Sequence, residues 1–286
     1  IAANNGGFQG STFDALNGEF KLMNGLVDVK DFAVKKTING KDYQATAKGI
    51  VPLKALFANS NEDLDDYERI KLDVNLDQAD LSILPFVSDQ VDWALGPTKG
   101  TLEFTGTLAH PLVNGTVSLS DGAVKFKPLA TPVTNMNATV VFNGDTMTVS
   151  DFSGKMGEGS YTGQGTLKLD GVTPSTYDFS LTADKLDIQS DFFKGPLSGS
   201  LRINNAEAFG KTLPKISGQI DLDNCTISVP TIPDSNGELP DVLLDVDVNV
   251  GDKVHAYSSY LYDMYLVGKV HFGGTTHHPK TSGSVS

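Results

Sequence analysis

The side chains best suited to chemistry in this sequence are its five histidines and a short run of carboxylates. His271, His277 and His278 are close enough in sequence to gather around one metal ion, but no glutamate or cysteine completes a spaced metal-binding motif. His110 and His278 each precede a proline at the same place in two copies of a repeat, which favours a structural role in a turn. The carboxylates within residues 62–68 lack the glycine and the final glutamate of a calcium-binding loop, and we interpret them as a solvated acidic loop. We therefore expect no metal ion and no other cofactor.

Nucleophilic and nucleotide-binding patterns are equally scarce. The single Cys225 lies in a strand-like setting and is interpreted as a small buried apolar residue. The glycine-rich residues 157–165 lead into a strand, so they lack the helix N-terminal amides that bind phosphate. A net charge of −13 argues against nucleic acid as a partner and against flat adhesion to anionic lipid headgroups. The sequence therefore predicts a protein that is not an enzyme and does not bind nucleic acid.

The elements that must position any functional residue are strands. Apolar residues alternate with Thr, Ser, Asp, Lys and Asn over most of the chain, which is typical of a sheet with one apolar and one solvent-facing side. Dipeptides such as Asn39-Gly40 and Asp121-Gly122 predict tight hairpin turns. We expect short helical turns within residues 54–67, 84–95 and 190–194, and no long helix. The predicted fold class is therefore all-β.

A strand-pair pattern recurs three times along the chain. Residues 100–118 are echoed by residues 268–286, and a degraded copy begins at 199–203 and resumes at 214–222. Longer similarities repeat at offsets of a little over one hundred residues, which is too long for a β-helix rung or a propeller blade. We predict an incomplete N-terminal unit at 1–69, a central unit at 70–175 and a C-terminal unit at 176–286, stacked continuously. Because the pattern is already under way at the first residues, we expect the chain to be a piece of a longer protein.

The apolar face of such a sheet needs a cover, and the sequence offers no amphipathic helices to supply it. The strands could form sandwiches packed face to face, or one long curved sheet could leave an open apolar groove. Residues 257–265 are rich in tyrosine and fit either a sheet edge or a ligand-facing rim. Strand parity predicts that the groove would be lined by Leu102, Phe104, Val117, Leu119, Val140, Phe142, Met147, Val149, Leu167, Leu169, Phe179, Leu181, Ile220, Leu222, Val246 and Val248.

The repeat resembles that of the TamB proteins, which belong to the AsmA-like group of diderm bacteria. Residues 100–119 carry the pattern of glycine, aliphatic and proline positions fully, residues 268–285 carry it without its end, and the copy at 199 has a stretched turn at 204–213. The resemblance implies a long open-grooved sheet, or β-taco, that carries phospholipid acyl chains across the periplasm. It also implies an inner-membrane anchor in the parent protein, an outer-membrane barrel-assembly partner, and no catalytic residues.

The leading hypothesis is thus a periplasmic lipid-conduit segment of an envelope protein that supports outer-membrane biogenesis. One alternative is a structural or adhesive module of tandem β-sandwiches. Another is a scaffold that receives outer-membrane protein strands by β-augmentation at an exposed edge.

Overall fold

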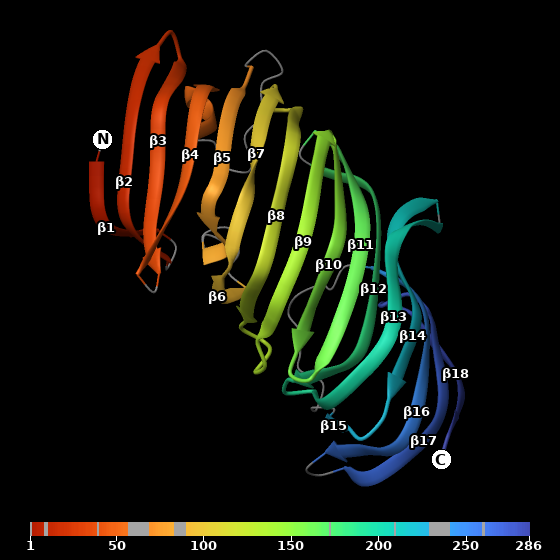
Figure 1. Ribbon diagram of the computed structural model, residues 1–286. Helices are drawn as coiled ribbons and strands as arrows, with labels where there is room; N and C mark the ends of the chain where they lie inside the picture. Colours follow the sequence, from red (N-terminus) through yellow and green to blue (C-terminus); the bar gives the residue numbers. More distant parts are fainter. Residues whose placement is uncertain are drawn as a thin grey trace. The chain divides into compact units, whose positions relative to one another are not determined.

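The computed structural model describes residues 2–8, 11–38, 40–56, 69–82, 90–171, 173–208, 210–228, 241–258 and 261–286. These residues form an 18-stranded sheet with short 3₁₀-helical segments at η1 (Leu53–Leu56) and at 81–82, so the all-β prediction is confirmed (Figure 1). In chain order the strands are β1 (Ala2–Phe8), β2 (Ser11–Met23), β3 (Leu26–Ile38), β4 (Lys41–Pro52), β5 (Lys71–Asp80), β6 (Val91–Leu95), β7 (Pro97–Gly106), β8 (Pro111–Phe126), β9 (Val133–Gly144), β10 (Thr146–Met156), β11 (Gly159–Asp170), β12 (Thr173–Gln189), β13 (Phe193–Ala208), β14 (Lys211–Leu222), β15 (Thr226–Ser228), β16 (Leu243–Ser258), β17 (Tyr262–Gly274) and β18 (Pro279–Val285).

The predicted helical turns are only partly found. The 3₁₀-helix η1 overlaps the start of the expected turn at 54–67, whose remainder lies outside the described residues. Within 84–95 residues 84–89 lie outside the described residues, and 91–95 form strand β6, which pairs with β8. A helix over 91–95 is therefore wrong, because pairing with a neighbour overrides the local spacing of apolar residues. Residues 190–194 form a bend, held by the Ser190 amide donating to the Phe193 carbonyl at 2.9 Å, and β13 begins at once.

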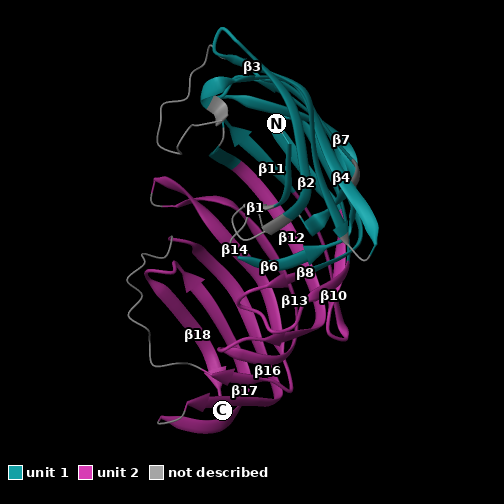
Figure 2. Ribbon diagram, turned by 90° about the vertical axis from the view of Figure 1, so that its left-hand side faces the viewer, with its two compact units in different colours: residues 1–124, 136–150, 166–175 teal, residues 125–135, 151–165, 176–286 magenta. Residues whose placement is uncertain are grey.

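The chain divides into two compact units, shown in separate colours in Figure 2. Unit 1 comprises residues 1–124, 136–150 and 166–175, and unit 2 comprises residues 125–135, 151–165 and 176–286. The three repeat units predicted from the sequence, at 1–69, 70–175 and 176–286, are defined by sequence similarity, and they stay a prediction.

Within unit 1 the pairing follows the chain. Strands β1 to β5, then β7 and β8, each pair antiparallel with the next, and β6 is bypassed between β5 and β7. Unit 2 is also mainly antiparallel, from β12 through β14 and from β16 through β18. The exception is a crossover, because β16 pairs parallel to β14 and to the short strand β15.

The three sequence copies form hairpins with the same register. In β7–β8, Gly100 lies opposite Val117 and Leu102 opposite Gly115. The corresponding pairs are Gly199–Ile220 and Leu201–Gly218 in β13–β14, and Gly268–Val285 and Val270–Gly283 in β17–β18. The repeat is therefore a repeat of strand pairing as well as of sequence.

In each of these hairpins two glycines with positive φ occupy corresponding positions. Gly100 has φ +150° and Gly115 has φ +138°, and a Cβ on them would lie 2.1 and 2.0 Å, respectively, from a carbonyl oxygen of the opposite strand. Only glycine tolerates both the dihedral angle and the close approach of the two backbones. This explains why the first and last glycines of the motif recur in all three copies.

Irregularities in the ladder mark one end of the long strands. In unit 2 the register shifts between Ala183 and Leu186 in β12 and between Val250 and Val254 in β16, with Lys253 at φ 57°. A β-bulge of this kind bends its strand. Residues before and after the bend, Val250 and Val254, meet Leu222 and Cys225 in one buried cluster. A similar cluster in unit 1 is formed by Val27, Val29 and Val51.

Candidate functional site

The apolar side chains of unit 2 form continuous rows across its strands. One row runs from Leu181 in β12 through Leu201 and Gly218 to Val246 and Phe272 in β17. Since residues that pair directly in a ladder present side chains on the same face, these residues share one face. The neighbouring rows contain four further predicted positions on the same face, Phe179, Ile220, Leu222 and Val248. The register thus brings six of the predicted residues together.

Exposure on this face varies both along and across the strands. Beside the bulges Val254 is 0% exposed, and Val250 and Leu222 are below 10%. In one row further along, Val246 is 7% exposed, but Leu181 is 36% and Phe272 is 37% exposed, and Ile203 in the next row is 42% exposed. The apolar face is therefore buried beside the bulges and partly open to solvent further along the strands. Exposed apolar side chains in a contiguous set are typical of a binding surface.

Unit 1 has an equivalent apolar face. A row of paired residues runs from Phe32 through Ala47, Val74 and Leu102 to Gly115, crossing β3, β4, β5, β7 and β8. Phe104 lies in the next row, opposite Leu72 and Val113. The predicted Val117 and Leu119 lie on the same face, because they pair with Gly100 and Thr98 of the same parity as Leu102. All four predicted residues of this hairpin are half-buried.

The remaining predicted residues belong to β9, β10 and β11 in unit 1. Each is half-buried and is flanked by exposed residues such as Val141, Thr148 and Lys168. These half-buried residues are Val140, Phe142, Met147, Val149, Leu167 and Leu169. A role for any of the sixteen residues in holding a ligand stays a prediction.

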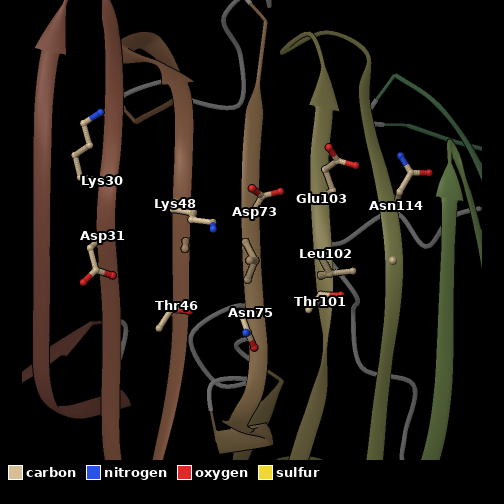
Figure 3. Close-up of a pocket in the computed structure, with 13 residues that line it drawn as sticks. Lys30, Asp31, Thr46, Lys48, Asp73, Asn75, Thr101, Leu102, Glu103 and Asn114 are labelled. Carbon is tan, nitrogen blue, oxygen red and sulfur yellow. The ribbon is translucent and has the colours of Figure 1, made fainter.

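The opposite face of unit 1 is polar and contains a shallow depression of about 620 Å³ (Figure 3). Lys48, Asp73, Glu103 and Asn114 follow one another across β4, β5, β7 and β8, in direct register. The lining offers amines, carboxylates, amides and hydroxyls, but no histidine or cysteine that could act as a base or nucleophile. The arrangement is that of a hydrated sheet surface.

Ion pairs follow the polar face of unit 2. The Arg202 Nε donates to Asp178 Oδ1 at 2.7 Å, and this hydrogen bond lowers the pKa of the Asp178 carboxyl. The Lys215 Nζ donates to Asp245 at 2.6 Å and lowers the pKa of Asp245 in the same way. These pairs are exposed, so they mainly fix side-chain orientation and contribute little to stability.

The histidines are placed by turns and by single carboxylates. The amides of His110 and His278 donate to the hydroxyls of Thr107 and Thr275, so the two copies of the turn have the same hydrogen bonds. His271 pairs with Asp247 at 2.8 Å, and no group of three potential metal ligands occurs among the described residues. The run at 62–68 lies outside the described residues.

Cys225 and Tyr161 are buried side chains that each carry a titratable group. Cys225 is 4% exposed, as predicted, and burial raises the pKa of its thiol. Tyr161 is 7% exposed, and its hydroxyl has no hydrogen-bond partner in the described part of the chain. Sequence reasoning missed Tyr161, although its alternation with Gly163, Gly165 and Leu167 places it on the same face of β11 as the apolar residues.

A membrane-spanning helix, which would need a long apolar stretch, is not found among the described residues.

Comparison with known proteins supports the resemblance seen in the repeat. Residues 148–281 match the family model described as the TamB C-terminal domain. The chain is 27% identical over 164 residues to SUBSTANDARD STARCH GRAIN 4, a chloroplast protein of Oryza sativa subsp. japonica. The aligned stretch covers 56% of this chain and 8% of that protein. It is 22% identical over 181 residues to TIC236, a chloroplast protein of Arabidopsis thaliana. That aligned stretch covers 62% of this chain and 8% of the relative. No solved structure matches significantly.

Proposed function

Since residues 148–281 of this chain belong to the TamB family, we propose that the chain is a lipid-conduit segment of an envelope protein. The family is one of envelope proteins of the lipid-transport type. In this proposal the apolar face carries phospholipid acyl chains between an inner and an outer membrane. The matched stretch covers only 8% of each plant relative, so the role concerns a segment of a much longer protein.

The observation that carries the proposal is the partly exposed apolar face of unit 2. Its rows continue from strand to strand, and Leu181, Ile203 and Phe272 are each more than one third exposed. A soluble sheet would ordinarily cover such a face with a second layer. An acyl chain lying on it would gain roughly 0.8 kcal/mol for each methylene removed from water.

The uniformity of the face suits movement as well as binding. Leucine, valine, isoleucine and phenylalanine recur from row to row, so an acyl chain meets similar surroundings at each step. Nondirectional apolar contacts of this kind provide no single deep minimum. We expect the polar headgroup to stay in water beyond the exposed end of the strands.

The proposed location is the periplasm of a diderm bacterium, in a parent protein anchored in the inner membrane. The proposed partner is an outer-membrane barrel-assembly protein, and the proposed process is outer-membrane biogenesis. The two plant relatives are chloroplast proteins, and the chloroplast envelope likewise has two membranes.

Charge substitutions on the exposed end of the apolar face test the proposal. Ile203→Glu and Phe272→Glu should leave the protein folded, because both positions reach solvent. They should reduce the uptake of fluorescent phosphatidylethanolamine at least about tenfold, because an acyl chain would bury the new carboxylate at a cost of several kcal/mol. Binding is measured by fluorescence titration, and co-purified phospholipid by mass spectrometry.

Ser200→Glu is the matched control, since Ser200 is exposed in the same strand as Ile203 but on the polar face. It should bind lipid like the parent chain. The proposal is wrong if the parent chain takes up no phospholipid, or if Ile203→Glu and Ser200→Glu lose binding equally. Unfolding by Ile203→Glu and Phe272→Glu would instead favour the tandem-sandwich alternative, in which both positions would be in a closed core.

A further inference from the structure

The outer end of the β16–β17 hairpin carries an aromatic cluster that lipid binding does not use. We call His255, Tyr257, Asp263 and Tyr265 the aromatic patch. The His255 ring stacks on Tyr265 at a centroid distance of 5.1 Å and contacts Tyr257 at 6.0 Å. Its Nε2 lies 2.7 Å from the Asp263 Oδ1. The four side chains therefore form one connected surface.

The aromatic patch lies on the face opposite to the apolar core. His255 and Tyr257 alternate along β16 with Val254 and Ala256, which are 0% and 7% exposed, and Val254 belongs to the buried cluster. The pairing of His255 with Tyr265 places the ring of Tyr265 on the same outer side. A change on the aromatic patch can therefore be made without touching the apolar face.

The patch is open to solvent. Tyr265 is 67% exposed and Tyr257 is 41% exposed, and the Asp263 side chain is 72% exposed. One face of the Tyr265 ring covers His255, and among the described residues no other ring stacks on it. The described residues likewise give the Asp263 carboxylate no hydrogen bond besides the one to His255, which leaves its second oxygen as an acceptor. Exposed tyrosine beside a fixed carboxylate is typical of the centre of a protein interface, where tyrosine and arginine are enriched.

The surrounding sequence is strongly acidic. Residues 223–267 contain eight aspartates and glutamates and one lysine, Lys253, which gives a net charge of −7 for this segment out of −13 for the chain. Within the described residues, Asp223 and Asp252 are exposed on this part of unit 2. Together with Asp263, these two carboxylates outnumber the exposed Lys253 beside them, which favours a cationic partner.

We propose that the aromatic patch docks a basic segment of a partner protein, with an arginine as its central contact. A guanidinium plane can stack on the free face of Tyr265 while its N–H groups donate to Asp263. Arginine fits better than lysine, because its planar group both stacks on aromatic rings and donates in a fork to a carboxylate. Stacking of a cation on an aromatic face is attractive because the ring face carries negative charge density, and neighbouring carboxylates speed the encounter.

The test uses the 286-residue chain and a fluorescent nine-residue peptide in which arginine alternates with threonine. We expect saturable binding in fluorescence anisotropy, weakened at least about fivefold by Tyr265→Ala and by Asp263→Asn. A peptide with lysine in place of arginine should also bind at least about fivefold more weakly. Uptake of fluorescent phosphatidylethanolamine should be unchanged in both variants.

Two substitutions elsewhere in unit 2 serve as matched controls. Phe192→Ala removes another exposed aromatic ring, and Asp178→Asn removes another exposed carboxylate. Both should bind the arginine peptide within about twofold of the parent chain. Equal loss in Asp178→Asn and Asp263→Asn would overturn the proposal, because it would show attraction by net charge alone. Binding to phosphatidylcholine vesicles that is lost in Tyr265→Ala, without peptide binding, would also overturn it and assign the patch to a membrane.

Discussion

Tyr161 is a buried tyrosine. Its ring packs 5.0 Å from that of Phe152, and burial raises the pKa of its hydroxyl to about 12. Because that hydroxyl has no hydrogen-bond partner among the described residues, it contributes a desolvation cost with no compensating bond. The ring itself fills the space beside Gly154, where a Cβ would lie 2.5 Å from the Tyr161 hydroxyl.

We predict that Tyr161→Phe stabilises the protein by about 1 kcal/mol at pH 7, because it removes the unpaired hydroxyl and keeps the ring. The effect should grow in alkali. A tyrosine whose pKa is raised on folding contributes its full stability below pH 10 and loses it as pH rises towards 12. A shift of this size corresponds to about 2–3 kcal/mol.

Urea unfolding at pH 7 and at pH 11 measures this difference. Tyr177→Phe, at a half-buried tyrosine, serves as the control and should lose stability in alkali as the parent chain does. A Tyr161→Phe variant that loses as much stability in alkali as the parent chain would contradict the prediction.

At the scale of single residues, the sequence allowed the shared face to be predicted but not the depth of burial. Parity placed Phe179, Leu181 and Val246 on one face correctly, because a strand alternates its side chains strictly until a bulge intervenes. The bulges beside Lys185 and Lys253 could not be foreseen, since lysine is not a residue that favours positive φ. They decide which end of the face is buried.

At the scale of elements, the paired glycines of each hairpin hold the two strands in close approach. We predict that Gly100→Ala and Gly115→Ala each destabilise the protein by about 2–4 kcal/mol, from backbone strain and contact with the opposite carbonyl oxygens. The measurement is the free energy of unfolding in urea.

Gly273→Ala is the control for that series. Gly273 lies in β17 without a positive φ, and a Cβ there would meet only the flexible His271 ring at 3.2 Å. We expect a change below about 1 kcal/mol. Equal costs at Gly100 and Gly273 would show that the positive dihedral angle has no part in the effect.

The elements that sequence reasoning missed are those whose conformation depends on a neighbour. Residues 91–95 have apolar positions at roughly helical spacing, yet they pair with β8 as strand β6. The parallel pairing of β16 with β14 could not be predicted either. Alternation of apolar residues indicates which face of the sheet a side chain is on, but not the direction of the neighbouring strand. Of the predicted turns, the one at 39–40 falls between the paired strands β3 and β4, but Asp121-Gly122 lies inside β8, where Asp121 has φ 50°, so a hairpin turn there is wrong. A local dipeptide indicates a positive φ but cannot distinguish a turn from an irregularity within a strand.

At the scale of the whole molecule, the net charge of −13 opposes folding through self-repulsion. We predict that raising the ionic strength from about 0.01 M to about 0.1 M increases the melting temperature by a few degrees, because the screening length falls from about 30 Å to about 10 Å. Circular dichroism measures the transition. The double variant Asp223→Asn, Asp252→Asn should show a smaller increase, and a melting temperature that falls with salt would indicate that attractive ion pairs dominate instead.

The common register of the three hairpins also bears on how such a protein can change in length. A hairpin inserted or deleted as a unit adds or removes two strands, which leaves every later side chain on its original face. Loss of a single strand would reverse the direction of all that follow it. Gene duplication can therefore lengthen the sheet in steps of whole hairpins without redesigning any one strand.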